Sequence, residues 1–139
     1  MGFAFVNDSV LLIHKTHPHH QKNKFNGLGG KVENKDNLNP LNSMVREFKE
    51  ESGISTANNQ WKFYGTIDFT KLHRVSVFYT DLNQTQIEVL NKKLNKSKDK
   101  DTEYIELFSK MEFEDLFEQD LLVSAVYEIV STINSSLRK

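Results

Sequence analysis

The sequence predicts an α/β fold in which helices cover a central mixed β-sheet, and two observations lead to this. Short segments with strand character dominate the first part of the chain, while amphipathic helical segments lie apart from one another. The continuous apolar run from Val10 to Ile13 is typical of a strand buried inside such a sheet. The length favours one domain, expected to cover residues 1–139.

Two strands joined by a tight turn are predicted at the start of the chain. They run from Gly2 to Val6 and from Ser9 to His14, with Asn7-Asp8 in the turn. The polar, histidine-rich segment from Thr16 to Lys24 is predicted to be a loop.

Three glycines, at positions 27, 29 and 30, lie within the segment from Phe25 to Val32. Glycine adopts backbone conformations that other residues avoid, so we expect unusual dihedrals or a closely approaching ligand here. A second polar loop is predicted from Glu33 to Asn39.

A helix is predicted from Pro40 to about Ser52. Asn39 is a favourable N-cap, proline suits the first helical position, and Gly53 suits the position just after a helix. The apolar residues follow helical spacing at Leu41, Met44, Val45 and Phe48.

The rest of the chain alternates between strands and helices. Strands are predicted at Trp61 to Phe69, Arg74 to Asp81 and Tyr104 to Phe108, and helices at Gln84 to Asn95, Glu114 to Phe117 (one turn) and Asp120 to Ile133. The charged run from Lys96 to Asp101 is expected to be a solvated loop, and Trp61 and Phe63 are expected in the core.

Composition excludes several classes of function. The formal net charge of −1 provides no general attraction for nucleic acid or an anionic membrane, so a polyanionic substrate needs a local site. The chain has no cysteine, which excludes disulfides, thiolate catalysis and cysteine-based zinc sites. With no signal peptide or apolar span, we expect a cytoplasmic protein, either monomer or homodimer.

Three carboxylates, Glu47, Glu50 and Glu51, fall on one stripe of the predicted Pro40 helix. Like charges at this spacing repel each other, and a hard cation such as Mg²⁺ or Mn²⁺ would neutralise oxygen ligands of this kind. The alternative is a solvated acidic surface relieved by Arg46 and Lys49.

The segment from Arg46 to Ile54, REFKEESGI, resembles the second half of the Nudix box, G-x5-E-x7-R-E-U-x-E-E-x-G-U, at every specified position. The first half departs from the pattern. Asp36 stands where the box beginning at Gly30 has glutamate, and the interval from there to Arg46 is two residues longer. The resemblance implies the Nudix α/β/α sandwich and hydrolysis of a diphosphate linkage with Mg²⁺ as cofactor, or Mn²⁺ in its place.

The same resemblance implies roles for individual residues. It makes Glu50 and Glu51 metal ligands, Glu47 a ligand or the base that deprotonates water, Arg46 the residue that orients them, Gly29 a carbonyl ligand and Asp36 a supporting acid. A further metal ligand is expected from a later loop, where Asp99, Asp101 and Glu103 compete and Glu103 is preferred.

The segment from Phe25 to Val32, FNGLGGKV, is similar to W-N-G-F-G-G-K-V of the oxidised-purine nucleoside triphosphatases, which are MutT-type members of this superfamily. The strand VSVFYTD at 75–81 is also similar to theirs. This implies that Asn26 binds the base and Lys15 contacts the nucleotide, with Phe117 and Asp120 in the base pocket. The structural alternatives are a turn residue at Asn26, a core aromatic at 117 and a helix cap at 120.

We therefore expect hydrolysis of a purine nucleoside triphosphate to the monophosphate and pyrophosphate. Dinucleoside polyphosphates, nucleotide sugars and capped RNA are the alternative substrates, and a non-catalytic nucleotide-binding module is the alternative from another class. A long nucleic acid is disfavoured by the near-neutral charge. The histidines at positions 14, 17, 19 and 20 match no zinc-site spacing and are expected to be loop residues.

Overall fold

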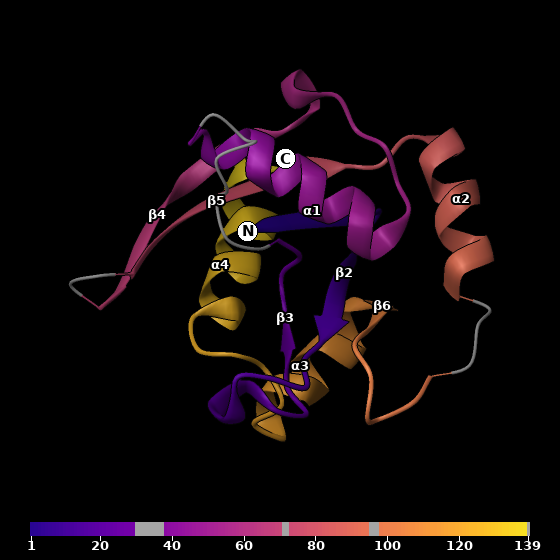
Figure 1. Cartoon of the computed structure of the whole chain (residues 1–139). Coiled ribbons are helices and arrows are strands. Elements are labelled where there is room, and N and C mark those ends of the chain that lie inside the picture. Colours follow the sequence, from indigo (N-terminus) through magenta and orange to yellow (C-terminus); the bar gives the residue numbers. More distant parts are fainter. Residues whose placement is uncertain (30–37, 71–72, 95–97, 139) are drawn as a thin grey trace.

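The computed structural model describes residues 1–29, 38–70, 73–94 and 98–138, which form a six-stranded mixed sheet with helices on both sides (Figure 1). The strands are β1 (Gly2–Val6), β2 (Ser9–His14), β3 (Phe25–Asn26), β4 (Lys62–Thr70), β5 (His73–Asp81) and β6 (Tyr104–Phe108). Their order is β3-β2-β1-β5-β4, and β6 also pairs with β2. β1 pairs with β5 in parallel and with β2 antiparallel, so the predicted mixed sheet is confirmed.

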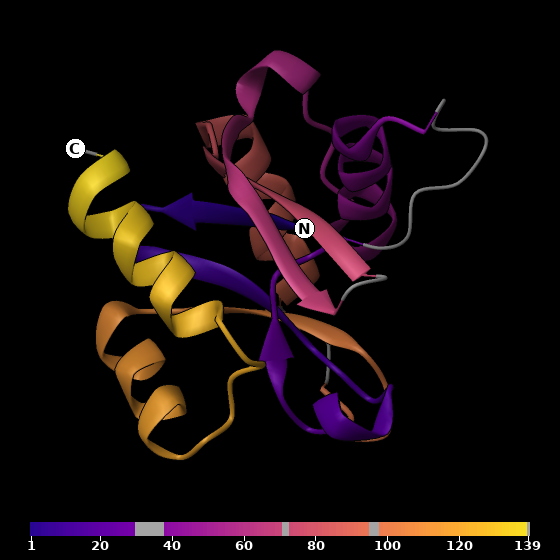
Figure 2. The ribbon, with the colours of Figure 1, turned by 90° about the vertical axis from the view of Figure 1, so that its left-hand side faces the viewer.

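Two helices cover each face of the sheet (Figure 2). Helices α1 (Pro40–Ser52) and α2 (Gln84–Leu94) lie on one face. Helices α3 (Lys110–Glu118) and α4 (Val126–Thr132) lie on the other, where α4 continues into a π-helical turn, η4 (Ile133–Leu137). Two 3₁₀ turns, η1 (His19–Gln21) and η3 (Asn58–Gln60), lie in loops. No helix in the described ranges has the length and apolar character needed to cross a membrane.

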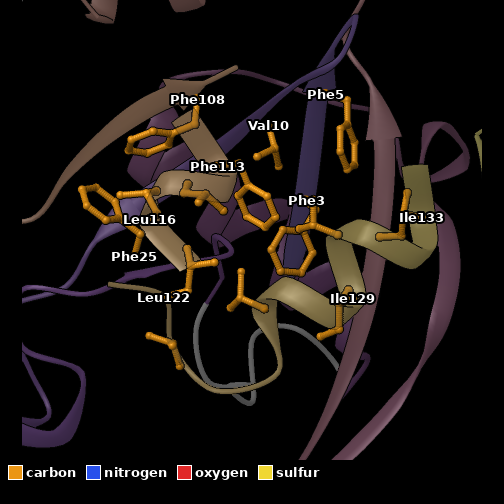
Figure 3. Packing of buried hydrophobic residues seen from close by; sticks show 14 of the residues in the cluster. Phe3, Phe5, Val10, Phe25, Phe108, Phe113, Leu116, Leu122, Ile129 and Ile133 are labelled. Atoms are coloured by element: carbon orange, nitrogen blue, oxygen red, sulfur yellow. The ribbon is translucent and has the colours of Figure 1, made fainter. Parts of the chain in front are cut away.

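Side-chain alternation along the strands divides the core into two clusters. In β1, Phe3 and Phe5 point into the cluster beneath α3 and α4, which Figure 3 shows, while Ala4 points into the cluster beneath α1 and α2. Both faces of β1 and β2 are therefore buried, as the apolar run in β2 predicts. His14, at the end of β2, is buried rather than in the loop.

Helix α1 has the predicted boundaries because both ends are capped. The Asn39 side chain accepts hydrogen bonds from the backbone N–H groups of Leu41 (2.9 Å) and Asn42 (3.2 Å). Gly53 ends the helix in the left-handed region with φ of 76°. Phe48 is fully buried and packs edge-on against the Trp61 ring, with centroids 5.1 Å apart, which fixes the helix on the sheet.

Two predictions for the last third of the chain were wrong. The single turn expected at 114–117 is part of the nine-residue helix α3, which begins at Lys110 and is capped by Ser109 in a reciprocal capping box with Glu112. The terminal helix expected from Asp120 begins at Val126, because the preceding segment pairs with β3. Phe25 donates to the Leu121 carbonyl (2.8 Å) and accepts from the Val123 N–H (2.9 Å).

Smaller differences concern β4, β5 and α2. Trp61 is buried as expected. Phe63 was expected in the core, but its side chain is 60% exposed and its ring lies 5.5 Å from that of Phe78 on β5, measured between centroids. β4 begins one residue later than predicted and β5 one residue earlier. The structure describes α2 from Gln84 to Leu94, and the predicted last residue, Asn95, lies outside the described residues.

Candidate active site

The carboxylates of α1 are held by specific donors. Arg46 Nη1 donates to Glu47 Oε1 at 2.7 Å and to Glu50 Oε1 at 3.2 Å. Glu47 is mostly buried and Glu50 is half-exposed, with side-chain exposures of 20% and 52%. One guanidinium therefore orients two of the three predicted carboxylates, as the sequence pattern implies.

The third carboxylate, Glu51, is held from outside the helix. Its Oε1 accepts a hydrogen bond from the Gly29 backbone N–H at 2.8 Å. Gly29 has φ of 134°, and an added Cβ would lie 3.1 Å from the backbone Cα of Met1, so both conformation and space favour glycine. The structure thus joins Gly29 to Glu51 through its amide; the predicted metal contact of its carbonyl remains a prediction.

A fourth carboxylate, Glu103, lies close to this group and carries its own donors. Its Oε2 is 3.0 Å from Lys15 Nζ, 3.5 Å from the Thr16 backbone nitrogen and 3.8 Å from His17 Nδ1. Glu103 and Lys15 both act electrostatically on Glu51. The structure therefore brings two predicted site residues, Lys15 and Glu103, to the carboxylates of α1.

A cavity of about 370 Å³ lies between the end of α1, β2, β6 and the end of α2, and Glu50, Glu51 and Glu103 line it. It is lined by charged and polar residues (Glu50, Glu51, Glu103, Lys93, Lys98, Thr102) and by Ile13, Leu94, Tyr104 and Ile105. Sequence reasoning missed Lys93 and Lys98, because surface lysines in a helix end and a charged run give no signal until the fold turns them toward a cavity.

The pKa of Glu51 is raised from 4.5 to about 7, mainly because burial disfavours its charged form and also because Glu47 and Glu103 are negatively charged neighbours. The Gly29 hydrogen bond and the positive charge of Lys15 act in the opposite direction. Such a group is costly to ionise unless additional positive charge is close to it.

The carboxylates that line the cavity suit a divalent cation. Hard ions such as Mg²⁺ and Mn²⁺ prefer oxygen ligands, and a bound cation would make ionisation of Glu51 less costly. In the described ranges, no three acidic or histidine side chains already converge at metal-binding distances. Arg46 and the Gly29 amide hold the α1 carboxylates in their present rotamers.

Asn26 lies on the same face of the sheet as the cavity. It pairs with Ile13 between β2 and β3, paired residues share a face, and Ile13 lines the cavity. The Asn26 Oδ1 accepts a hydrogen bond from the N–H of Gly27 at 2.8 Å. This contact is the one expected of a turn residue, the alternative role given for Asn26. Its predicted contact with a base remains a prediction.

The remaining predicted residues lie elsewhere. The Phe117 ring is 46% exposed and stacks on Tyr127 at 3.8 Å between centroids, on the face covered by α3 and α4. Asp120 is exposed, caps no helix, and lies 3.5 Å from Lys24 Nζ. Neither lines the cavity with Glu51. Asp36 and Gly30 lie outside the described residues.

The competing acids and the histidines are also placed. Asp99 and Asp101 are exposed, and Asp99 accepts from the Asp101 N–H at 2.9 Å within its loop, so Glu103 alone of the three lines the cavity. His14 stacks on Tyr104, with centroids 4.6 Å apart, and its Nδ1 lies 3.1 Å from the Thr102 carbonyl oxygen.

Comparisons with known proteins support this description. The family model described as "NUDIX domain" matches residues 2–129. Among similar solved structures is the crystal structure of a bifunctional NMN adenylyltransferase/ADP ribose pyrophosphatase from Francisella tularensis, complexed with AMP and a manganese ion. It has a TM-score of 0.64 and 16% identity, so the likeness concerns the fold, and the match covers 96% of this chain and 39% of that one.

This chain thus spans less than half of that protein's length. A comparison with curated proteins gives no significant match. The match to the family model covers nearly the whole chain, with the REFKEESGI segment on the helix that carries the clustered carboxylates. The chain belongs to the NUDIX domain family, which confirms the resemblance seen in the sequence.

Proposed function

We propose that the chain hydrolyses a nucleoside triphosphate to the monophosphate and pyrophosphate, using a divalent cation held by the α1 carboxylates. One observation carries this proposal: Glu51, whose pKa burial raises to about 7, shares a cavity with Glu50, Glu103 and two lysines. Clustered carboxylates supply cation ligands, and lysines supply charge for phosphate oxygens.

The residues of the chain divide the work. Glu50 and Glu51 bind the cation, Glu47 binds it or takes a proton from the attacking water, and Arg46 positions Glu47 and Glu50. Glu103 is a further candidate ligand, and Lys15 contacts phosphate. The bound cation, Mg²⁺ or Mn²⁺, would neutralise phosphoryl charge and lower the pKa of water.

The substrate class proposed first is a purine nucleoside triphosphate, including one with an oxidised base. It is supported by the FNGLGG segment and by the position of Asn26 on the cavity's face, since an amide offers both a donor and an acceptor to a purine edge. A nucleotide sugar is the second candidate, because the similar Francisella tularensis protein is described as an ADP ribose pyrophosphatase and was crystallised with AMP.

A turnover screen tests the proposal. Purified protein with Mg²⁺ or Mn²⁺ is given ordinary and oxidised purine triphosphates, ADP-ribose, dinucleoside polyphosphates and capped RNA, and the products are identified. We expect pyrophosphate from a purine triphosphate, and a raised KM in Asn26→Ala. Turnover of ADP-ribose alone would reject a nucleoside triphosphate as the substrate and retain the catalytic helix. Tight nucleotide binding with no turnover of any substrate would overturn the proposal in favour of a binding module.

A further inference from the structure

His14 is a buried histidine that the proposed chemistry does not use. It is 5% exposed and lies at the end of β2, opposite Phe25 of β3 and Tyr104 of β6 in the sheet. The imidazole stacks on the Tyr104 ring at 4.6 Å between centroids, and it meets the Phe25 ring edge-on at 5.4 Å. Phe108, 4.8 Å from Phe25 between centroids, belongs to the same aromatic group beneath α3 and α4 (Figure 3). Any flat aromatic ring would suit this position.

The imidazole makes one contact that a phenylalanine ring could not make. His14 Nδ1 lies 3.1 Å from the carbonyl oxygen of Thr102. A carbonyl oxygen only accepts hydrogen bonds, so Nδ1 carries a proton and donates it. Burying an imidazole costs more than burying a hydrocarbon ring unless its polar atoms have partners. The contact that distinguishes histidine from phenylalanine at this position is therefore the one to the Thr102 carbonyl.

His14 holds the chain on both sides of Glu103. It donates to the carbonyl of Thr102 and stacks on the side chain of Tyr104. Thr102 is also held from its other side, since its backbone N–H and its hydroxyl both donate to the Asp99 carbonyl, at 3.1 and 3.0 Å. Glu103 lies between these contacts and lines the cavity together with carboxylates of α1. A shift of the backbone on either side would move the Glu103 carboxylate within the cavity.

We propose that His14 is a positioning residue for the cation site, because it fixes the backbone on either side of Glu103 and so keeps this carboxylate beside those of α1. His14 does not line the cavity and acts through the backbone. Its neighbour Lys15 lies 3.0 Å from the Glu103 carboxylate, so β2 holds Glu103 both by its backbone and by its side chain. The inference rests on the proposed function for the cation, and not on the identity of the substrate.

Equilibrium binding of Mn²⁺ to the metal-free chain, followed by electron paramagnetic resonance of the free ion, tests this role without a substrate. His14→Phe keeps a stacked ring and removes the donor. It should weaken Mn²⁺ binding about tenfold, as substitutions behind a metal ligand commonly do. His14→Asn keeps a side-chain N–H near the place of Nδ1 and removes the ring. It should bind Mn²⁺ within about threefold of the unsubstituted chain.

Urea unfolding of the same variants in EDTA should give the opposite order. His14→Asn loses the contacts of a buried ring and should unfold at lower urea than His14→Phe. A purely structural role would instead weaken Mn²⁺ binding most in the least stable variant. Phe108→Leu is the matched control, because Phe108 is buried in the same aromatic group on β6 and does not line the cavity. It should lower stability and leave Mn²⁺ affinity unchanged.

A double-mutant cycle shows whether His14 acts through Glu103. Glu103→Gln should weaken Mn²⁺ binding at least as much as His14→Phe does. Adding His14→Phe to Glu103→Gln should then change the affinity by less than about twofold, because the carboxylate that His14 positions is already gone.

The proton on Nδ1 can be observed directly. In alkaline buffer with EDTA, where an imidazole is neutral, ¹⁵N NMR should show the ring proton of His14 on Nδ1. The signals of His14 are those that disappear in His14→Phe. A proton on Nε2 instead would leave Nδ1 with nothing to donate to the Thr102 carbonyl, and this result would overturn the inference whatever the metal affinity.

Equal Mn²⁺ affinity of His14→Phe and the unsubstituted chain would also overturn the inference, and so would a loss that persists in full on top of Glu103→Gln. Failure of the proposed function is a separate result. A chain that turns over no nucleotide but shows the coupled loss of Mn²⁺ affinity keeps the positioning role of His14. An active chain whose Mn²⁺ affinity does not depend on His14 keeps the function without that role, and a chain that binds no Mn²⁺ has neither.

Discussion

At the scale of single residues, Glu51 connects the fold to the proposed chemistry. Its backbone is the last turn of α1, its carboxylate accepts from Gly29 across the loop, and its neighbours Glu47 and Glu103 oppose its ionisation. Any cation bound nearby lowers the cost of this negative charge. The residue therefore links protonation, cation binding and stability.

The raised pKa of Glu51 has a defined sign in stability measurements. The folded chain keeps this proton up to about pH 7, whereas an unfolded chain releases it near 4.5. Its stabilising contribution is therefore complete below pH 4.5 and is lost as the pH rises through 7. The loss is at most about 3 kcal/mol, from 1.36 kcal/mol per pKa unit.

Urea unfolding in EDTA at pH values from 5 to 8 measures this effect. Glu51→Gln, which cannot ionise, should gain stability relative to the unsubstituted chain as the pH rises, and added Mg²⁺ should stabilise the unsubstituted chain more at pH 8 than at pH 5. A difference between the two proteins that stays constant with pH would show that Glu51 has an ordinary pKa in the fold.

At the scale of elements, some helix boundaries can be predicted from local sequence and others depend on tertiary contacts. The boundaries of α1 were predictable because Asn39, Pro40 and Gly53 are local signals, and its buried face followed from spacing. The Ser109–Glu112 capping box is also a local signal, and it marks the start of α3. The start of α4 was not predictable, because it depends on Leu121 and Val123 pairing with Phe25, nearly a hundred residues away.

The same distinction applies to the site. The α1 carboxylates and Lys15 were predictable from a motif and a resemblance, whereas the approach of Lys93 to the cavity depends on how α2 packs. Asn26 lies on the face of the cavity, and its contact with a base stays a prediction. Phe117 does not line the cavity, because its ring stacks on Tyr127. The direction in which a side chain points depends on long-range packing, which the spacing of residues in the sequence does not reveal.

The Asn39 cap should contribute measurably to the stability of α1. Asn39→Ala removes the acceptor for two backbone N–H groups and should cost about 1 kcal/mol. Asn39→Ser keeps a capping oxygen and should cost less. Chemical denaturation of the three proteins checks this order, and equal stability of all three would show that the Pro40 end of the helix needs no cap.

At the scale of the whole molecule, Arg138 connects the C-terminal helical turn to two strand ends of the sheet. Its Nη2 donates to the Asn7 carbonyl at 2.6 Å, its Nε donates to Asp81 Oδ1 at 3.0 Å, and its guanidinium lies 4.1 Å from the centroid of the Phe5 ring. These contacts join the β1–β2 turn, the end of β5 and the last helical turn into one body.

Removing this tie should destabilise the whole fold. Arg138→Ala should lower the free energy of unfolding by about 2 kcal/mol, because a side chain only 12% exposed loses ionic, backbone and cation–π contacts together. Arg74→Ala is the matched control, since Arg74 pairs with Asp68 at the surface and is 73% exposed. It should change stability by less than about 0.5 kcal/mol. Equal effects would place the Arg138 contacts among ordinary surface pairs.

In the proposed enzyme, α1 brings a cation-binding carboxylate to a diphosphate substrate. Turnover of the best substrate with Mg²⁺, compared between the unsubstituted chain, Glu51→Gln and Glu118→Gln, tests it most directly. Glu118 is exposed at the end of α3 on the opposite face and should leave turnover unchanged. We expect a loss of about 10³-fold in kcat/KM for Glu51→Gln. Turnover by Glu51→Gln within a few-fold of the unsubstituted chain would contradict it.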